Sequence, residues 1–156
     1  MEEEKAAGFP KLENLLCFPL YAASRRIVGL YTPYLKELGL TYTQYLVFLV
    51  LWDGDGVTVG EVCRRLYLDS GTLTPLLKNL EKAGYVTRRR SKEDERVVLV
   101  SLTEAGQALK EKMTDVPRCV GGALPISREE AGTLYGLLYK ILEPDRASAD
   151  ETKEEE

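Results

Sequence analysis

The sequence predicts a mainly helical fold with one small β-hairpin, and three observations lead to this expectation. Apolar residues recur at helical spacing along much of the chain, for instance over residues 12–38. The pattern changes over residues 85–102 to two strand-like runs that a charged turn divides. Apolar residues make up 44% of the 156 residues, which is enough to build a hydrophobic core.

Helices are expected throughout the part of the chain that precedes the hairpin. Pro19 and Pro33 are the predicted start or bend points of the first and longest helix. We expect Thr43 to cap the second helix, a capping box to open the third at Thr58, and Asp69 or Ser70 to cap the fourth. The predicted ranges are 12–39, 44–52, 58–66 and 70–83.

Two more helices are expected after the hairpin. Thr103 should cap the first of them, and a second capping box at Ser127 should open the last one. Pro117 and the Gly121-Gly122 pair are expected to interrupt the chain between these helices. The predicted ranges are 85–90 and 97–102 for the strands, and 103–114 and 127–142 for the helices.

The order of these elements predicts a winged helix-turn-helix. The short third helix and the capped fourth helix form the helix-turn-helix, whose second helix enters the major groove of DNA. The hairpin that follows is the wing. We therefore assign residues 41–102 to a DNA-binding domain, residues 1–11 to a flexible acidic arm and residues 143–156 to a disordered acidic tail.

Composition argues against several classes of protein. The chain has no histidine, which excludes histidine-based catalytic triads and histidine-ligated metal sites. Cys17, Cys63 and Cys119 lie far apart, without the spacing of a disulfide framework or a zinc site. No apolar run reaches the ~18 residues of a membrane helix, and the acidic N-terminus does not resemble a signal peptide. We expect a cytoplasmic protein that is not an enzyme and holds no metal or cofactor.

The net charge of −4 is unusual for a DNA-binding protein, but the charge is unevenly distributed. Residues 78–96 carry seven basic and four acidic side chains, whereas residues 143–156 carry seven acidic and two basic ones. An acidic chain with a locally basic segment is compatible with binding to DNA phosphates.

Residues suited to DNA recognition lie at the start of the fourth helix and on the hairpin. Small polar side chains that donate hydrogen bonds fill the first turns of the helix, and one lysine is placed to meet a phosphate. At the hairpin tip, an arginine can enter the minor groove while a carboxylate holds its guanidinium. The alternative without a role in DNA binding is an ordinary amphipathic helix followed by a solvated turn. The predicted DNA-binding residues are Ser70, Thr72, Thr74, Lys78, Arg88, Asp94 and Arg96.

Several strings of this sequence are typical of a known family. LDSGTLTPLLK at 68–78, GYVTR at 84–88, DER at 94–96 and LTEAG at 102–106 resemble the MarR family of transcriptional regulators. LCF at 16–18, with Tyr21, Tyr31 and GLTYTQY at 39–45, is similar to the organic-hydroperoxide-sensing, OhrR-type branch. The resemblance runs from about Leu12 to Pro117, and the last helix matches only in pattern.

The resemblance implies a homodimer that binds a pseudo-palindromic operator through two winged helices. Residues 12–40 and 103–142 would supply the dimerisation helices. Cys17 would be the peroxide-reactive thiol of a repressor that oxidation releases from DNA, and Tyr31 and Tyr42 would hydrogen-bond that thiol across the subunit boundary. The sequence departs from the family pattern at Asn79, where relatives often carry an arginine that contacts phosphate.

Local features of the sequence also favour a reactive Cys17 over a buried, inert one. Pro19 fits the first turn of a helix, so Cys17 should lie at the helix N-terminus, where backbone N–H groups stabilise a thiolate. Reaction with an organic hydroperoxide would give a sulfenic acid. A low-molecular-weight thiol or Cys119 of the other subunit would then resolve it, and we favour Cys119. Cys63 is expected to be a passive packing residue.

Three other functions remain open at this stage. A MarR-type repressor that responds to a small aromatic ligand would share the fold and the DNA contacts. A winged helix can also serve protein association without DNA. A thiol enzyme has the least support, because Cys17 has no histidine to act as its base.

Overall fold

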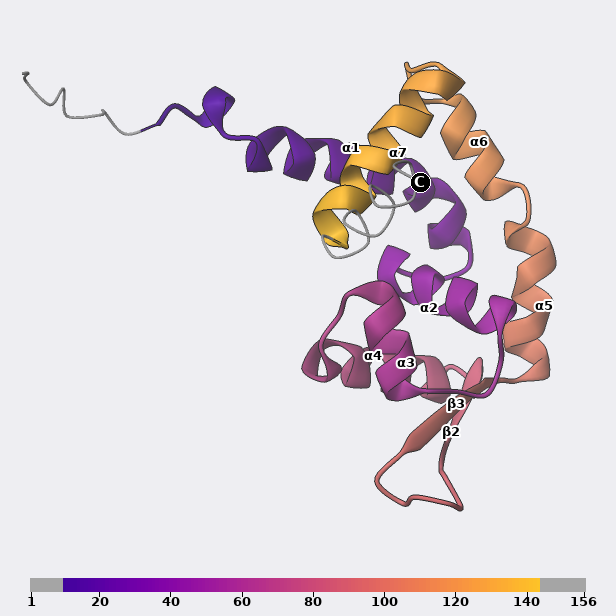
Figure 1. Cartoon of the computed structure of the whole chain (residues 1–156). Coiled ribbons are helices and arrows are strands. Elements are labelled where there is room, and N and C mark those ends of the chain that lie inside the picture. The colour runs from indigo at the N-terminus through magenta and orange to yellow at the C-terminus, as the bar shows by residue number, and fades with distance from the viewer. Residues whose placement is uncertain (1–9, 144–156) are drawn as a thin grey trace, which may run out of the picture. The chain divides into compact units, whose positions relative to one another are not determined.

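The computed structural model describes residues 10–143, and the chain divides into two compact units, Met1–Gly122 and Ala123–Glu156. The predicted acidic arm and tail therefore lie almost entirely outside the described residues. In Figure 1, the first unit contains, in chain order, η1 (Leu12–Asn14), α1 (Cys17–Glu37), α2 (Tyr42–Asp53), β1 (Val57–Thr58), α3 (Val59–Leu66), α4 (Ser70–Lys82), β2 (Val86–Arg90), β3 (Val98–Leu102), α5 (Glu104–Met113) and α6 (Val116–Gly122). The second unit contains α7 (Arg128–Leu142).

The first helix begins later than its apolar pattern predicted. Residues 12–14 form a separate 3-10 turn, Leu15 is extended, and α1 begins at Cys17. The cause is Pro19, whose ring clashes with a helical carbonyl four residues earlier and so prevents a continuous helix through Leu15. The expectation that Cys17 lies at a helix N-terminus is confirmed.

The second helix is capped by Thr41, so the prediction of Thr43 was wrong. The Thr41 hydroxyl accepts a hydrogen bond from the Gln44 N–H at 3.3 Å, and Gln44 Oε1 accepts one from the Thr41 N–H at 2.9 Å. A capping box needs Glu or Gln three residues after the cap, and Thr41 meets that condition whereas Thr43 does not.

The helix-turn-helix has the predicted caps, but the capping box expected at Thr58 does not form, because the Glu61 side chain pairs with Arg64. The Thr58 hydroxyl accepts the Glu61 N–H at 3.0 Å and opens α3, and Asp69 accepts the Thr72 N–H at 2.8 Å and opens α4. Between the two helices, Tyr67 adopts a left-handed conformation with φ of 53°, which turns the chain sharply. The α4 side chains that face the core are Leu73, Leu77 and Leu80.

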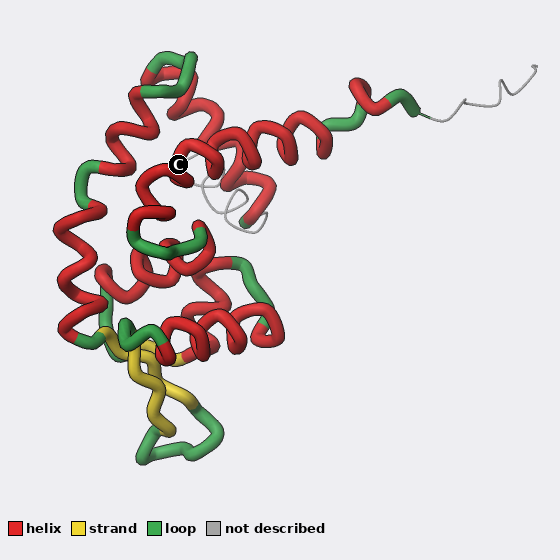
Figure 2. The backbone as a smooth tube through the Cα atoms, turned by 180° about the vertical axis from the view of Figure 1, so that it is seen from behind, coloured by secondary structure: helices red, strands yellow, loops and turns green. Residues whose placement is uncertain are grey.

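The wing is part of a three-stranded antiparallel sheet in the order β1-β3-β2. The predicted hairpin is present, with Arg88 opposite Val100 and Arg90 opposite Val98. Figure 2 shows the strands near the helical body and the loop between them projecting beyond it. The sequence did not reveal β1, because a strand of two residues is too short to show a pattern.

A short helix, α6, forms where an interruption was predicted. Pro117 is its second residue, a position at which the missing N–H has no helical acceptor. The Gly121-Gly122 pair ends the helix, and Val116 and Val120 bury their side chains. The caps predicted for α5 and α7 are confirmed, since Thr103 accepts the Gly106 N–H and Ser127 forms a capping box with Glu130.

One buried side chain in the core leaves its polar atom unsatisfied. Tyr45 is 1% exposed, and its hydroxyl has no hydrogen-bond partner among residues 10–143. Burial and the neighbouring Tyr31 and Tyr42 raise the pKa of Tyr45 to about 12. Among the described residues, no helix combines the length and apolar character that a bilayer span needs.

Replacing Gly106 with alanine should destabilise the first unit strongly. A Cβ at Gly106 would lie 2.1 Å from the Tyr85 carbonyl oxygen, and that backbone atom cannot easily move. We expect the free energy of unfolding to fall by about 2–4 kcal/mol. Urea denaturation followed by the single Trp52 measures this, because the Trp52 indole N–H donates to the Gly106 carbonyl at 3.2 Å. Gly60→Ala is the control, since a Cβ at Gly60 would lie at an ordinary 3.8 Å from its nearest neighbour, the Thr58 hydroxyl. Equal losses in both variants would contradict the steric argument.

Replacing Tyr45 with phenylalanine should leave stability unchanged or raise it by up to about 1 kcal/mol, because it removes a buried hydroxyl that has no partner. The raised pKa predicts an alkaline effect as well. A folded-state pKa of about 12 against an ordinary 10.0 means that the unfolded chain loses its proton first, so stability falls between these values. Thermal unfolding from pH 8 to 11 should show a shallower alkaline loss in Tyr45→Phe. A clear loss of stability at pH 7 would show that the hydroxyl has a partner in solution.

Candidate nucleic-acid interface and reactive cysteine

The first turn of α4 is held rigidly by Asp69. One carboxylate oxygen accepts the Thr72 N–H at 2.8 Å, and the other accepts the Thr72 hydroxyl at 2.8 Å. These hydrogen bonds from Thr72 lower the pKa of the Asp69 carboxyl, so it stays ionised. Ser70, Thr72 and Lys78 are exposed and Thr74 is half-buried.

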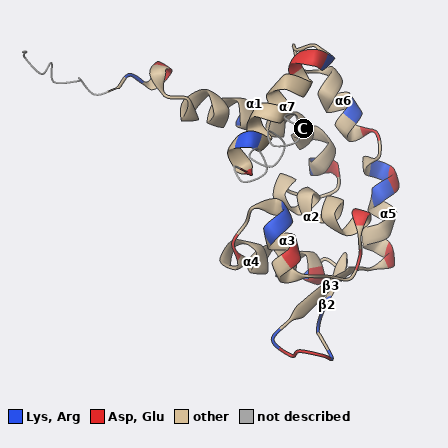
Figure 3. Ribbon diagram, viewed as in Figure 1, with Lys and Arg blue, Asp and Glu red and all other residues tan. Residues whose placement is uncertain are grey.

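The wing presents one arginine in a fixed conformation. Asp94 accepts hydrogen bonds from the Arg96 backbone N–H at 3.0 Å, from Nε at 3.1 Å and from Nη2 at 3.3 Å. The Arg96 side chain nevertheless stays 92% exposed. Its hydrogen bonds lower the pKa of the Asp94 carboxyl. The predicted support of Arg96 by a carboxylate is therefore present in the geometry, and Figure 3 shows basic and acidic residues side by side around this loop.

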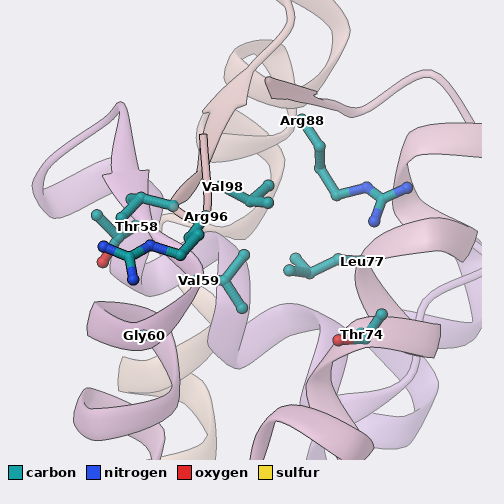
Figure 4. A pocket seen from close by; sticks show the side chains of 9 residues that line it. Thr58, Val59, Gly60, Thr74, Leu77, Arg88, Arg96 and Val98 are labelled. Carbon is teal, nitrogen blue, oxygen red and sulfur yellow. The ribbon is translucent and has the colours of Figure 1, made fainter. Parts of the chain in front are cut away.

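A concave pocket with a volume of about 470 Å³ lies between the helix-turn-helix and the wing. Figure 4 shows Arg96 lying over Thr58 at the start of α3, and Arg88 directed toward α4. Arg88 differs from Arg96 because its guanidinium is paired with Glu81, at 2.7 Å. The lining residues are Thr58, Val59, Gly60, Thr74, Leu77, Arg88, Arg96, Val97 and Val98.

Cys17 is an exposed thiol at the first position of α1. No side chain caps this helix end, but the Phe18 N–H donates to the Leu15 carbonyl at 3.1 Å and Pro19 has no N–H, so the first turn has few N–H groups left for a thiolate. The apolar neighbours Leu16 and Phe18 are themselves exposed, by 70% and 38%. In Figures 1 and 2, the first turns of α1 extend away from the helices that form the core of its unit. The Cys17 thiol is therefore accessible to solvent in the part of the chain that the structure describes.

The two predicted tyrosines lie together, but far from Cys17 of the same chain. Their ring centroids are 5.1 Å apart, and both pack against Tyr45, at 5.6 Å for Tyr31 and 6.3 Å for Tyr42. A helical rise of ~1.5 Å per residue places Tyr31 roughly 20 Å along α1 from Cys17. Contact between the thiol and either hydroxyl would thus need a second chain.

Burial keeps these tyrosines in the donor form. It raises the pKa values of Tyr31 and Tyr42, and the charge of Tyr31 adds to the effect on Tyr42. Hydroxyls that stay protonated can donate hydrogen bonds to a thiolate over the whole neutral range. The sequence analysis did not single out Tyr45 as part of this cluster, although its position one helical turn after Tyr42 was a usable signal.

The other two cysteines differ in their surroundings. Cys119 lies on α6 and is exposed, whereas Cys63 is partly buried and packs against the core from α3. Both are free thiols, as is Cys17. Across residues 10–143, no group of three or more side chains is arranged to ligate a metal ion.

The second unit carries an apolar surface on its helix α7. Tyr135 and Tyr139 contact each other with ring centroids 4.5 Å apart. No residue of α7 is buried by the other described residues of the chain. The exposed apolar residues of this helix are Leu134, Tyr135, Leu137, Tyr139, Ile141 and Leu142.

Comparison with known proteins identifies the family. The family model described as Transcriptional regulator SarA/Rot matches residues 29–113. The Organic hydroperoxide resistance transcriptional regulator of Bacillus subtilis is 52% identical over 133 residues, which cover 85% of this chain and 90% of that protein.

Solved structures of AbfR from Staphylococcus epidermidis are also similar. Reduced AbfR bound to DNA aligns with a TM-score of 0.72 and 38% identity, covering 85% of this chain and 91% of that one. The disulfide-formed AbfR aligns with a TM-score of 0.61 and 38% identity, covering 84% and 92%. The fold and the motifs agree with both comparisons, and the chain belongs to the winged-helix transcriptional regulators of the SarA/Rot and MarR type, in their OhrR-type branch.

Proposed function

We propose that this protein is a cytoplasmic transcriptional repressor that binds a pseudo-palindromic operator as a homodimer and is released when an organic hydroperoxide oxidises Cys17. The observation that carries the proposal is the exposed Cys17 thiol at the uncapped start of α1, in a chain that also carries a winged helix. The name of the Bacillus subtilis relative and the DNA-bound reduced state of AbfR support both halves of the proposal.

DNA binding would use α4 and the wing together. The polar start of α4 enters the major groove, with Lys78 on a phosphate, while Arg96 reaches the adjacent minor groove. A two-fold dimer presents two such surfaces to half-sites about 34 Å apart. The exposed apolar faces of α1 and α7 suit the dimer contact that this spacing requires.

Sensing would begin with nucleophilic attack by the Cys17 thiolate. The sulfur bonds to one peroxide oxygen and the O–O bond breaks, which leaves a sulfenic acid on the protein and releases an alcohol after proton uptake. Exposed Leu16 and Phe18 favour a peroxide with an organic group over a small polar oxidant. Tyr31 and Tyr42 of the second chain would donate hydrogen bonds to the thiolate, and the new oxygen would disrupt that arrangement.

The sulfenic acid would then be resolved by Cys119 of the other chain, which is exposed on α6. Attack by its thiolate forms the S–S bond and expels the sulfenic oxygen as water. A low-molecular-weight thiol is the alternative resolving group. In this scheme Cys17 is a sensor that reacts once per signal and does not turn peroxide over as an enzyme would.

Replacing Cys17 with serine should lock the protein on its operator. We expect the reduced variant to bind DNA like the wild type, because Cys17 lies outside the winged helix, and cumene hydroperoxide should no longer release it. Fluorescence anisotropy with the DNA upstream of the protein's own gene measures both properties. Cys63→Ser is the matched control and should still be released. Release of Cys17→Ser by peroxide would refute the sensing role, and release by an aromatic acid would favour the ligand-responsive alternative.

Replacing Cys119 with serine should prevent an intersubunit crosslink. Oxidised wild type should migrate as a covalent dimer on a non-reducing gel, and Cys119→Ser should migrate as a monomer. Mass spectrometry after dimedone labelling should then find the sulfenic acid on Cys17. A crosslink that persists in Cys119→Ser would remove this residue from the resolving role.

A further inference from the structure

We propose that Glu81 is a positioning residue for DNA binding, and that its pairing with Arg88 holds the wing against the recognition helix and withholds Arg88 from the phosphates. The inference rests on the proposed DNA-binding function and revises the expectation that Arg88 contacts DNA. The two residues of the pair belong to different elements, since Glu81 lies near the end of α4 and Arg88 lies within β2.

The contact fixes both the backbone and the side chain of Arg88. Glu81 Oε1 accepts the Arg88 backbone N–H at 3.1 Å, while Oε2 accepts Nε at 3.0 Å and Nη2 at 2.7 Å. Both carboxylate oxygens are thus engaged by one residue. Hydrogen bonds from Arg88 also lower the pKa of the Glu81 carboxyl, so the pair stays ionised near neutral pH.

The two arginines beside the concave pocket are held in different ways. The Arg88 side chain is 23% exposed and tied to a different element, whereas the Arg96 side chain is 92% exposed and paired within the wing itself. In Figure 4, the Arg88 side chain runs toward α4 and Arg96 lies over the first turn of α3. A carboxylate engages Nε and Nη2 of both guanidinium groups, so the difference between them lies in exposure, and the largely covered Arg88 side chain is less accessible to a phosphate than Arg96.

The position of the pair explains how it affects the wing. Arg88 pairs with Val100 across the hairpin, in the same two strands whose loop carries Arg96. A short hairpin alone is only marginally stable, so its direction depends on what anchors it to the body. Glu81 provides such an anchor on the helix that enters the major groove. The angle between the two DNA-contacting elements would therefore depend on this contact.

Salt dependence separates a positioning role from a phosphate contact. Each phosphate contact that is lost lowers the slope of log affinity against log salt by about 1. A residue that only orients the wing changes affinity without changing the number of counterions released. Lys78→Gln is the matched control, because this exposed lysine on α4 is the predicted phosphate contact.

The experiment measures operator affinity by anisotropy at several salt concentrations for the full chain. Glu81→Gln and Arg88→Gln should each weaken operator binding roughly tenfold, because the loss of one hydrogen bond to a charged group has about this effect. The slope of log affinity against log salt should stay at the wild-type value in both variants. The double variant should be no weaker than either single variant. Lys78→Gln should lower the slope. Peroxide oxidation of Cys17 should proceed at the wild-type rate in every variant.

Folding of the variants is checked by Trp52 fluorescence. If Glu81→Gln does not fold, the exchanged pair Glu81→Arg with Arg88→Glu should recover affinity that Arg88→Glu alone loses. Three outcomes would overturn the positioning role. Glu81→Gln could bind with wild-type affinity, the exchanged pair could fail to recover affinity, or Arg88→Gln could lower the salt slope by about 1. A wild-type chain that does not bind the operator would instead overturn the proposed function, and the inference with it.

Discussion

The burial of the leucine stripe of α4 is the interaction on which the rest of the DNA-facing surface depends. Leu73, Leu77 and Leu80 are essentially inaccessible to solvent, so rotation of the helix would expose apolar area on one side and bury polar groups on the other. This packing leaves Lys78 on the opposite, exposed face, while Ser70 is exposed because it is the first residue of the helix. The helix period therefore converts a core contact into a defined orientation of Lys78, which is predicted to contact a phosphate.

The wing takes its place from the same helix. Glu81 continues α4 one turn beyond Leu77 and contacts β2 through Arg88. On the other edge of the hairpin, β1 adds a third strand beside β3. Three strands with one anchored edge are more stable than an isolated hairpin, so the loop that carries the exposed Arg96 is better fixed in position.

The proposed sensor is divided between two distant parts of the chain. Cys17 occupies the start of α1, whereas Tyr31 and Tyr42 cluster with Tyr45 near the junction of α1 and α2. Because a helix is stiff, these groups cannot meet within one chain, and the thiol would be completed only at a subunit boundary. An oxidation that changes this boundary would act directly on the spacing of the two recognition helices, which is a physical basis for coupling between the sites.

The sequence by itself determined the helix starts at Thr58, Asp69, Thr103 and Ser127. In each cap, the side chain accepts the backbone N–H three residues later, so both partners lie in one short stretch of sequence. It also determined the hairpin and the place of Cys17 at the start of a helix. The family motifs likewise named the chain's relatives correctly. Errors arose where one local signal had two interpretations. Thr41 and Thr43 were both candidate caps of α2, and Pro117 was expected to interrupt the chain but lies in the first turn of α6.

Tertiary structure alone decided β1, the cluster around Tyr45 and the pairing of Glu81 with Arg88. Each of these depends on groups that different elements bring together, such as Val57 beside Val100. No local pattern encodes such contacts, because their partners are chosen by the packing of the core. The same packing decides that the Arg88 side chain is largely covered whereas the Arg96 side chain stays exposed.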